Sequence, residues 1–511
     1  MIATSSCRAL AARCEGVRMQ GPDLPITGLS ADSRQVAPGF LFAALAGTRT
    51  VGSHFVTAAL AAGAVAVLHD GSLELPASVA QFSHPNPRHA LALLAAAFYG
   101  NPARQMRMVA ITGTNGKTST AAMVEAILLQ QGERVGVIGT TGIRYPGFEQ
   151  ANPLTTPDPV ALHRQLRNMA DNRCSSVVME VSSHALDQHR TAGIPWQVAV
   201  FTHLSRDHLD YHQTEQAYFD SKAALFLRDG PARAVIGIEE PWGQRLAQRC
   251  LGVLPVATFS IGPPVHAPVV PPLTDPALVA QPFYADDIAL SWLGCRFRLH
   301  TPVGTLPVTL PGAGRFNVAN ALAAAATGWQ LGIPEATIAA GLRQFSPAPG
   351  RMQTVQGGQP FAVVVDYAHT PDALERVLQT ARSLTTGRII AVFGCGGERD
   401  SGKRPLMGQV AARLAEQTIV TDDNPRSEDP QAIRDAIVQG CRQEAGSVEV
   451  LPDRAEAIAH AIAMADPGDA VIIAGKGHET VQITAKGCQP FDDVQTARHC
   501  LAAQGWKEVL Q

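Results

Sequence analysis

Apolar runs and turn-forming residues alternate along the chain, and the blocks that they form predict an α/β protein. Near the start, short apolar runs surround an alanine-rich helical stretch at 55–62. Further on, short runs rich in β-branched residues alternate with longer helical stretches, as in parallel strands joined by crossover helices. The apolar runs are 39–45, 64–68, 109–112, 135–138, 176–180, 198–201, 361–366, 389–393, 418–421 and 470–474.

A change of pattern near residue 101 and a Ser-Pro-Ala-Pro-Gly break at 346–350 divide these blocks into three predicted domains. We expect a small α/β domain at 1–101, a central parallel-sheet domain at 102–346 and a Rossmann-like domain at 347–511. The segment 262–282 is rich in Pro and Val and shows neither period, so we expect a loop or a hairpin there.

The composition is that of a folded multidomain protein. Of its 511 residues, 46% are hydrophobic and 17% are charged, which is enough for several cores. The 41 Lys and Arg nearly balance the 44 Asp and Glu, so no overall basic field favours nucleic-acid binding. The longest apolar stretches, such as 55–68 and 90–99, are shorter than the roughly 18 residues of a membrane helix. We expect no nucleic-acid partner and no membrane span.

Cysteine usage and the first residues predict the compartment. The 9 cysteines are scattered and include no Cys-x-x-Cys pair, which favours a reducing environment. Residues 1–14 lack the basic start and the sustained apolar core of a secretory signal. We therefore expect a cytoplasmic protein, and separately we expect it to act as a monomer.

The most specific motif is a glycine-rich turn, Gly-Thr-Asn-Gly-Lys-Thr at 113–118, between an apolar strand and a helical stretch. Its glycines let backbone N–H groups approach phosphate oxygens, Lys117 supplies a positive charge, and Thr118 can offer a hydroxyl to Mg²⁺. The usual spacing would place another glycine at Ile111, so this is a shorter variant, and a purely structural turn is the alternative. The predicted nucleotide contacts are Gly113, Thr114, Asn115, Gly116, Lys117, Thr118 and Ser119.

Acidic and histidine residues follow two of the predicted strands. Glu180 ends the strand at 176–180, and His208 comes shortly after the strand at 198–201. Ligands in open α/β sheets bind beyond the carboxyl ends of strands, so both side chains could reach an ion held by Thr118. Mg²⁺ prefers oxygen ligands, which makes Glu180 the natural partner and His208 a less usual one. The other histidines here are expected to be loop or hydrogen-bonding residues: His184, His189, His203 and His212.

Taken together, the motifs resemble those of the Mur ligases, in the order of that family and over nearly the whole chain. The resemblance implies a first domain for a UDP-linked substrate, a central domain for ATP and a third domain for an amino acid. It implies ATP-driven amide-bond formation through an acyl phosphate, joining meso-diaminopimelate to UDP-N-acetylmuramoyl-L-alanyl-D-glutamate for peptidoglycan. The segments that carry the resemblance are 113–118, 180–184, 207–212, 316–320, 350–352, 366–371 and 423–426.

The resemblance also implies catalytic, metal and ATP-site residues. Lys222 matches a family lysine that CO₂ converts to a carbamate, which would give Mg²⁺ an anionic oxygen pair. Without the resemblance, Lys222 would be interpreted as a solvated helical lysine. The implied catalytic residues are Lys117, Lys222 and His208, and the implied Mg²⁺ ligands are Thr118, Glu180, His208 and carbamylated Lys222. The implied ATP contacts beyond the turn are Asn317, Arg351 and Asp366.

Two further sets are implied for the other substrates. In the amino-acid set, Arg426 suits the extra carboxylate that distinguishes diaminopimelate from lysine, because a guanidinium can bind a carboxylate through two parallel hydrogen bonds. Glu479 would pair with the distal ammonium. Residues 423–426 could alternatively form only a turn before the next helix. A turn and an amino-acid site are compatible with each other. The UDP-substrate set is Ser33, Thr155, Thr156, Ser182, Gln188 and Arg190, and the diaminopimelate set is Arg399, Asp423, Asn424, Pro425, Arg426, Gly475 and Glu479.

Two other functions compete with this interpretation. A different ligase of the same superfamily, such as a folylpolyglutamate synthase, would share the glycine-rich turn, but Arg426 and the first domain speak against it. A switch or ATPase that binds a partner and forms no bond would hydrolyse ATP without an acceptor amine and would not need Lys222. His203 stands where we expect Asn in members of the family.

Overall fold

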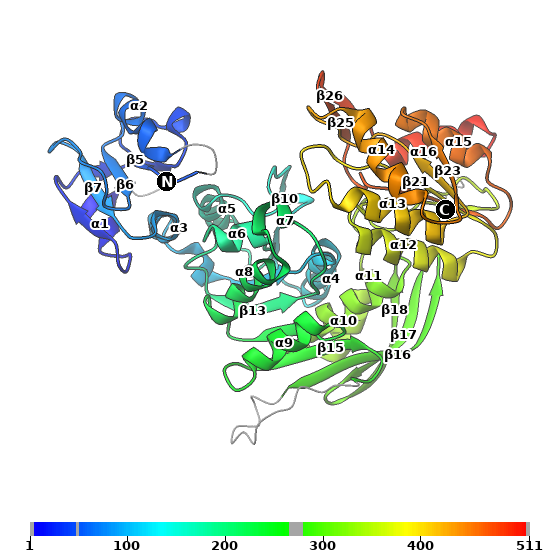
Figure 1. Cartoon of the computed structure of the whole chain (residues 1–511). Coiled ribbons are helices and arrows are strands. Elements are labelled where there is room, and N and C mark those ends of the chain that lie inside the picture. Colours follow the sequence, from blue (N-terminus) through cyan, green and yellow to red (C-terminus); the bar gives the residue numbers. More distant parts are fainter. Residues whose placement is uncertain (1–4, 48–50, 265–279, 507–511) are drawn as a thin grey trace. The chain divides into compact units, whose positions relative to one another are not determined.

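The computed structural model describes residues 5–47, 51–264 and 280–506, and Figure 1 follows the chain from blue to red. The contacts between residues divide the chain into two compact units. The first comprises Met1–Thr112, Gly132–Ala199 and Ser221–Arg233, and the second Gly113–Gln131, Val200–Asp220 and Ala234–Gln511. The chain passes from one unit to the other within strand β13 (Trp196–Phe201) and helix α8 (Glu215–Leu227).

The first unit contains a short antiparallel β1–β3 pair and two larger groups of paired strands that mix parallel and antiparallel pairs. One follows the order β2-β7-β6-β5-β4, in which only the β2–β7 pair is antiparallel. The other follows β11-β10-β9-β12-β8, with parallel β9, β12 and β8 and an antiparallel β10–β11 extension. The strands are β1 (Ser5–Ser6), β2 (Arg18–Gln20), β3 (Pro25–Ile26), β4 (Gly28–Ser30), β5 (Phe40–Ala43), β6 (Ala66–His69), β7 (Ala80–Ser83), β8 (Arg107–Thr112), β9 (Val135–Gly139), β10 (Gly142–Tyr145), β11 (Phe148–Gln150) and β12 (Ser176–Glu180). The helices are α1 (Cys7–Ala11), η1 (Ser33–Gln35), η2 (Gly52–Phe55), α2 (Val56–Ala61), α3 (Pro87–Phe98), η3 (Pro102–Gln105), α5 (Pro159–Asp171) and α6 (Ser183–Asp187).

The second unit begins its sheet with parallel β14, β15 and β16 and continues it with an antiparallel meander, β16-β17-β18. Its other sheet has the order β19-β20-β24-β21-β22-β23, in which all pairs except β19–β20 are parallel. The strands are β14 (Ala234–Gly237), β15 (Val256–Ile261), β16 (Gln281–Ser291), β17 (Gly294–Thr301), β18 (Gly304–Pro311), β19 (Gln353–Thr354), β20 (Ala362–Asp366), β21 (Ile389–Phe393), β22 (Gln417–Val420), β23 (Ser447–Val450), β24 (Ala470–Ala474), β25 (Val481–Thr484) and β26 (Gly487–Pro490). The helices are α4 (Lys117–Gln130), α7 (Leu209–His212), α9 (Pro241–Cys250), α10 (Arg315–Gln330), α11 (Glu335–Gln344), α12 (Pro371–Leu384), α13 (Lys403–Leu414), α14 (Pro430–Cys441), α15 (Arg454–Ala463) and α16 (Asp493–Ala503).

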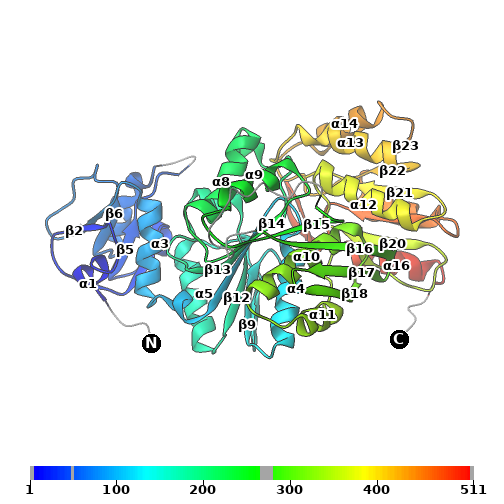
Figure 2. The same ribbon diagram turned by 90° about the horizontal axis from the view of Figure 1, so that it is seen from below.

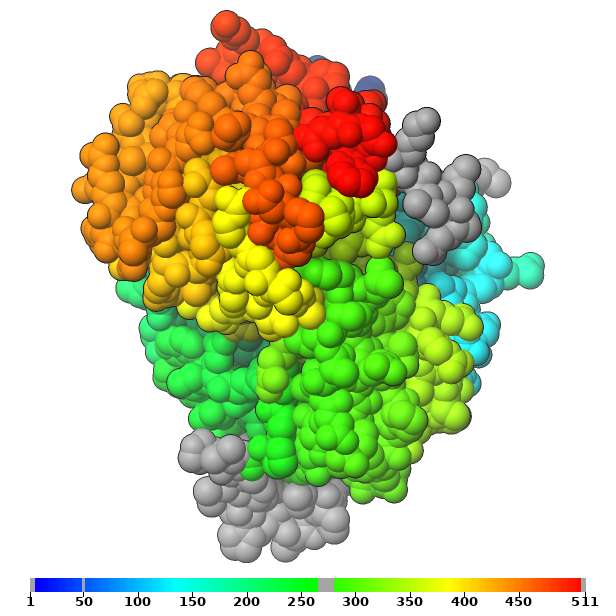
Figure 3. Space-filling view, turned by 90° about the vertical axis from the view of Figure 1, so that its right-hand side faces the viewer, coloured from blue at the N-terminus to red at the C-terminus, as the bar shows by residue number. Residues whose placement is uncertain are grey.

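The β19–β24 sheet is buried on both faces, which is why its strands are continuous apolar runs. Successive residues of a strand point to opposite faces, so Val364 belongs to one hydrophobic cluster and Val363 and Val365 to the other. Helices α12, α13 and α14 cover the first face (Figure 2), and α15 and α16 cover the second. This arrangement confirms the predicted Rossmann-like α/β architecture. Figure 3 shows one face of the chain in a space-filling view, in which the residues drawn yellow to red lie next to one another.

The meander β16-β17-β18 is an element that the sequence interpretation missed. Its strands bury only alternate side chains, such as Phe283, Phe297 and Val308, and pack that face near helix α10. The predicted loop or hairpin at 262–282 falls largely on residues 265–279, which lie outside the described residues. In the described part of the chain, no helix is both long and apolar enough to span a bilayer. All 9 cysteines are free thiols.

The buried His163 on α5 leads us to expect that acid destabilises the first unit. Its side chain is fully buried, and neither ring nitrogen has a hydrogen-bond partner among the described residues. Burial lowers the pKa of the His163 imidazole from 6.5 to about 4. The unfolded chain therefore binds a proton below pH 6.5 that the folded chain resists. The contribution of His163 to stability is complete above pH 6.5 and falls by on the order of 3 kcal/mol as the pH drops through 4.

We expect the free energy of unfolding in urea to decrease between about pH 7 and about pH 4, and the decrease to be smaller in His163→Phe. His54→Phe, at an exposed position of the same unit, is the matched control and should follow the wild type. Equal slopes in the wild type and in His163→Phe would contradict this account.

Candidate nucleotide and amino-acid sites

The glycine-rich turn joins the end of β8 to the start of α4, and two of its glycines are required by their surroundings. Gly116 has φ +85° and Gly113 has φ +146°. A Cβ on Gly113 would lie 1.9 Å from Oγ1 of Thr202, and a Cβ on Gly116 would lie 2.5 Å from Oδ1 of Asn320. Only glycine satisfies both the left-handed backbone and this close approach. The turn therefore packs directly against Thr202 and Asn320.

Lys117 folds back over this turn. Its Nζ donates to the carbonyl oxygens of Gly113, at 2.9 Å, and Thr114, at 2.8 Å. Thr202 Oγ1 donates to the carbonyl oxygen of Asn115 at 2.7 Å and fixes the middle of the turn. The ammonium and the N-terminus of the 14-residue helix α4 thus place positive charge at one point, which suits an anionic phosphate.

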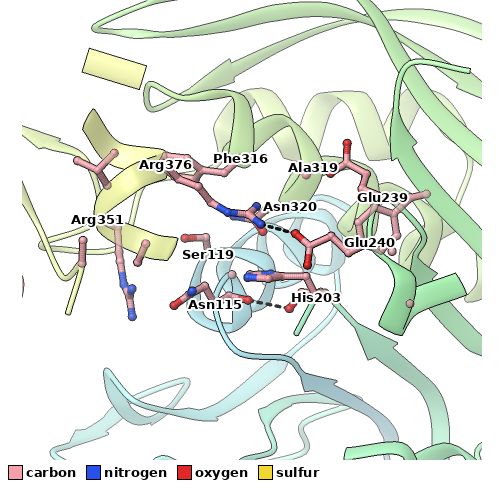
Figure 4. A pocket seen from close by; sticks show the side chains of 18 of the residues that line it. Asn115, Ser119, His203, Glu239, Glu240, Phe316, Ala319, Asn320, Arg351 and Arg376 are labelled. Atoms are coloured by element: carbon pink, nitrogen blue, oxygen red, sulfur yellow. Dashed lines mark hydrogen bonds and ion pairs between the residues drawn. The ribbon is translucent and has the colours of Figure 1, made fainter. Parts of the chain in front are cut away.

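A cavity of about 880 Å³, including its opening to solvent, lies beside the turn (Figure 4). Of the predicted nucleotide contacts, five line this cavity: Asn115, Gly116, Ser119, Arg351 and Asp366. Asn317 is 4% exposed, is not among the lining residues, and donates through Nδ2 to the carbonyl oxygen of Ala313 at 2.8 Å. One helical turn further on, Asn320 lines the cavity instead.

Two residues of the cavity wall, Arg351 and Asp366, are connected through the neighbouring Met352. The N–H of Met352 donates to Oδ2 of Asp366 at 2.7 Å. Burial raises the pKa of the Asp366 carboxyl, and the nearby Arg351 guanidinium partly opposes this shift. Arg351 itself lies over the ring of Tyr367, 4.7 Å from its centroid. A buried carboxylate beside the cavity offers an acceptor for a ligand hydroxyl.

Asp372 on the first turn of α12 is a connecting residue that the sequence interpretation missed. Its Oδ2 accepts from Nδ2 of Asn115 at 3.3 Å and from Oγ of Ser205 at 3.2 Å. Nε2 of His203 lies 3.4 Å from the same oxygen. Burial raises the pKa of Asp372, but His203 and Arg376 outweigh that effect and lower it below its usual range. Asp372 therefore joins α12 to the glycine-rich turn.

Arg376 extends the connection across the cavity. Its Nε donates to Oδ1 of Asp372 at 3.0 Å and its Nη2 to Oε1 of Glu240 at 2.6 Å, and Figure 4 shows it reaching Glu240. Two features of the sequence could have indicated this connection. One is His203 in place of the Asn expected in the family, and the other is the pair Asp372 and Arg376, four residues apart. Such a pair is usually a surface feature of a helix.

We expect Asp372→Ala to weaken ATP binding, because Asn115 and Arg376 both lose their acceptor beside the cavity. The KM for ATP should rise about tenfold, from a loss of roughly 1–2 kcal/mol, whereas kcat changes less. Glu375→Ala, three residues along the same helix and outside the cavity, is the matched control. An unchanged KM for ATP in Asp372→Ala would show that the connection does not contribute to nucleotide binding.

The predicted metal ligands divide between the two units. In the first unit, Glu180 is 1% exposed, and its two carboxylate oxygens accept from the N–H of Thr140 at 2.9 Å and from its hydroxyl at 3.2 Å. Lys222 on α8 is also 1% exposed. In the second unit, Thr118 is 6% exposed, whereas the His208 side chain is 43% exposed and lies 3.5 Å from Asp207.

The donors suit a hard cation only in part as they stand. The buried Glu180 carboxylate and the Thr118 hydroxyl are oxygen donors of the kind that Mg²⁺ prefers. A buried ammonium at Lys222 would repel the ion, so this position fits only in a carbamylated form. Within residues 5–47, 51–264 and 280–506, no three His, Cys, Asp or Glu side chains form a group that could hold a metal ion. The magnesium site stays a prediction.

Five of the six residues predicted for the UDP-linked substrate lie together in the first unit. The Thr156 hydroxyl donates to the carbonyl oxygen of Glu180 at 3.0 Å and accepts from the N–H of Ser182 at 3.0 Å. Arg190 donates to the carbonyl oxygen of Thr156 at 2.8 Å and, through Nη2, to Oε1 of Gln188 at 2.7 Å. Thr155 shares a 3.1 Å hydrogen bond with Thr140. Ser33, in η1, has no hydrogen bond to this cluster among the described residues.

The predicted amino-acid set lies in the second unit, after the carboxyl ends of β21, β22 and β24. Nδ2 of Asn424 donates to Oε2 of Glu479 at 2.6 Å. Arg426 has φ +55°, and its Nη1 donates to the carbonyl oxygen of Gly397 at 2.7 Å. Burial raises the pKa of Asp423, an effect opposed by Arg454 and Lys476. The loop combines a guanidinium with a carboxylate, which suits a zwitterionic ligand.

Two residues of this set make contacts that the motifs did not indicate. A Cβ on Gly475 would lie 2.5 Å from Oδ2 of Asp423, so this glycine allows the two loops to meet. Arg399 lies beyond the end of β21, and its Nη1 is 3.4 Å from the carbonyl oxygen of Glu398. Pro425 connects Asn424 to Arg426 in the backbone of the loop.

Comparison with known proteins gives three family matches in sequence order. The model described as "Mur ligase family, catalytic domain" matches residues 25–99, "Mur ligase middle domain" matches 111–328, and "Mur ligase, glutamate ligase domain" matches 350–477. These matches occupy the three successive α/β segments of the chain.

Several known ligases that share one name are similar to this chain over nearly their whole length. UDP-N-acetylmuramoyl-L-alanyl-D-glutamate–2,6-diaminopimelate ligase of Synechococcus elongatus is 44% identical and covers 94% of this chain and 95% of its own. The ligase of that name from Geobacillus kaustophilus is 41% identical, with 95% and 96% covered. A solved structure of such a ligase has a TM-score of 0.66, 35% identity and coverages of 94% and 96%. Folylpolyglutamate synthase of Mycobacterium tuberculosis, at 19% identity and a TM-score of 0.61, shares the fold.

Proposed function

The chain belongs to the Mur ligase family, and on that premise we propose that it adds meso-2,6-diaminopimelate to UDP-N-acetylmuramoyl-L-alanyl-D-glutamate. It is an ATP-dependent acid–amino-acid ligase of class 6.3.2 and serves peptidoglycan precursor synthesis. The observation that carries this conclusion is the loop in which Asn424 bonds Glu479 and Arg426 presents a guanidinium. An ammonium site at Glu479 and a carboxylate site at Arg426, on two adjoining loops, match the distal end of diaminopimelate.

The negative charges of ATP and of the substrate carboxylate must be neutralised before the two can react. The γ-carboxylate oxygen of the substrate's D-glutamate attacks the γ-phosphorus of ATP, and ADP leaves with the bridging oxygen. The amine of diaminopimelate then attacks the carbonyl carbon, phosphate leaves, and the amine loses a proton. Lys117 and the N-terminus of α4 offset the charge of the phosphates as these oxygens approach one another. When bound, Mg²⁺ would neutralise further phosphate charge, and Thr118, Glu180, His208 and carbamylated Lys222 would hold it.

We assign the remaining contacts by substrate. The turn 113–119 binds the phosphates of ATP, the cavity beside it binds the nucleoside, and Asp366 accepts from the ribose. Ser33, Thr155, Thr156, Ser182, Gln188 and Arg190 bind the UDP-linked substrate, with Arg190 directed to an anionic group. We place the domain boundaries at 1–101, 102–346 and 347–511. We also propose that the protein is cytoplasmic, which its unpaired cysteines support, and that it acts as a monomer.

A coupled assay of the purified chain tests this function. We expect phosphate release and a ligated product only when ATP, the UDP-linked dipeptide and diaminopimelate are all present, and far less with lysine as the amine. Activity with lysine alone would disprove the substrate assignment. Ligation of glutamate to a folate would favour a folylpolyglutamate synthase, and hydrolysis of ATP without any amine would favour a switch or ATPase.

Lys222→Met should lower kcat by about a hundredfold or more, because methionine keeps the buried volume but cannot take up CO₂. Lys222→Arg retains the positive charge and should be equally inactive. In the wild type, activity should fall when CO₂ and bicarbonate are removed and recover when bicarbonate is restored. Full activity of either variant would exclude a carbamate at this position.

A further inference from the structure

A lysine with no exposed surface lies directly behind the amino-acid loop. Lys476 follows β24, and its side chain is 0% exposed. Its Nζ donates to Oδ1 of Asn424 at 3.0 Å, to Oε2 of Glu479 at 3.3 Å and to the carbonyl oxygen of Val481 at 2.7 Å. An ammonium has three N–H donors, so these acceptors satisfy it completely. The buried charge is paired, and it does not itself face a ligand.

The amide of Asn424 makes three hydrogen bonds within the same network. Its Oδ1 accepts from Lys476 and from the N–H of Ile483, the latter at 2.9 Å, while its Nδ2 donates to Oε2 of Glu479 at 2.6 Å. Both Asn424 and Lys476 therefore donate to the same oxygen of Glu479. Oε1 takes part in neither bond, and the Glu479 side chain is 30% exposed. The network thus fixes one carboxylate oxygen and leaves the other for a ligand.

The hairpin β25–β26 ties this network to Arg426. The N–H of Arg426 donates to the carbonyl oxygen of Ile483 at 3.0 Å, and Arg426 and Thr484 form a parallel bridge. Nε2 of Gln482 also donates to the carbonyl oxygen of Asp423 at 2.9 Å. Because Lys476 holds Val481 at the start of the hairpin, it links the backbone of Arg426 to the carboxylate of Glu479. The spacing between the two charged groups of the site depends on that link.

We propose that Lys476 is a positioning residue for the recognition of the amino acid, acting through Asn424 and Glu479. The proposal rests on the function proposed above. Removing the ammonium would leave Oδ1 of Asn424 and Oε2 of Glu479 without a charged donor in a buried region, so the carboxylate would lose its fixed orientation. The cavity beside the glycine-rich turn is lined by other residues, so the loss should fall on the amino acid and not on ATP.

Lys476→Met tests the proposal in the full-length enzyme. We expect the KM for diaminopimelate to rise about 10- to 100-fold, the usual cost of unpairing a buried charged group, with the KM for ATP changed less than about threefold. Lys486→Met is the matched control, because Lys486 is an exposed lysine on the same hairpin and should leave both constants unchanged. If Lys476→Met does not yield folded protein, Lys476→Gln keeps two N–H donors without the charge and carries the same test.

A double-mutant cycle separates positioning from a general structural role. In the Glu479→Gln background, Lys476→Met should add less than about a threefold further increase in KM, because its effect passes through Glu479. The proposal would be overturned if Lys476→Met raised the KM for diaminopimelate equally in the wild type and in Glu479→Gln. A parallel rise in the KM for ATP would also overturn it. Failure of the wild type to use diaminopimelate would instead overturn the proposed function.

Discussion

Lys117→Met should reduce kcat by about a thousandfold or more, the largest effect that we expect from a single substitution. Lys117 supplies the ammonium that lies over the glycine-rich turn, donating to the carbonyl oxygens of Gly113 and Thr114. Two anionic substrates must approach each other during phosphoryl transfer, and removing this charge leaves their repulsion uncompensated at the transition state. Single-turnover release of phosphate, at saturating amounts of all three substrates, measures this step directly.

The comparison variants separate the charge from the fold. Lys117→Arg retains a positive charge but not the compact ammonium that fits the turn, so we expect it to recover only part of the rate. Lys486→Met, at an exposed lysine, should behave like the wild type. If Lys117→Met kept more than about a tenth of the wild-type rate, the turn would be a structural connection and ATP would have to bind elsewhere.

The parallel strands could be predicted from the sequence because both of their faces are buried. Strands such as β12, with Val177 and Val178 on opposite faces, and β20 are buried on both sides, so their sequences are uninterrupted apolar runs. The meander β16–β18 has one exposed face, and Arg296 and Arg298 interrupt its apolar residues, so no continuous run marks it. Its strands are recognisable only by their period of two, which is a weaker signal.

The candidate site was predictable where chemistry is concentrated in a short segment. Residues 113–118 and 423–426 each carry several informative residues within a few positions. Asp372 contacts Asn115 across 257 positions of sequence, and Arg376 contacts Glu240 across 136. The residues that neighbour a single aspartate or arginine on a helix do not show whether its side chain makes a long-range contact or is solvated. Lys476 was missed for the same reason, since burial and not residue type reveals its role.

Replacing Arg426 should change which amine the enzyme prefers. The residue adopts φ +55°, a left-handed conformation that asparagine accepts more readily than most residues, so Arg426→Asn is the appropriate substitution. It removes the guanidinium and preserves the backbone bond from the N–H of Arg426 to Ile483. The substitution therefore tests the role of the guanidinium charge without changing the backbone of the loop.

In Arg426→Asn, kcat/KM for meso-diaminopimelate should fall about 100- to 1,000-fold, equivalent to about 3–4 kcal/mol, because the extra carboxylate loses a charged, bidentate donor. The value for lysine, which lacks that carboxylate, should change less than about threefold. Arg442→Asn, at an exposed position after α14, is the matched control and should affect neither amine. A uniform loss for both amines would mean that Arg426 supports the loop without selecting the substrate, and the carboxylate site would then have to lie elsewhere in the second unit.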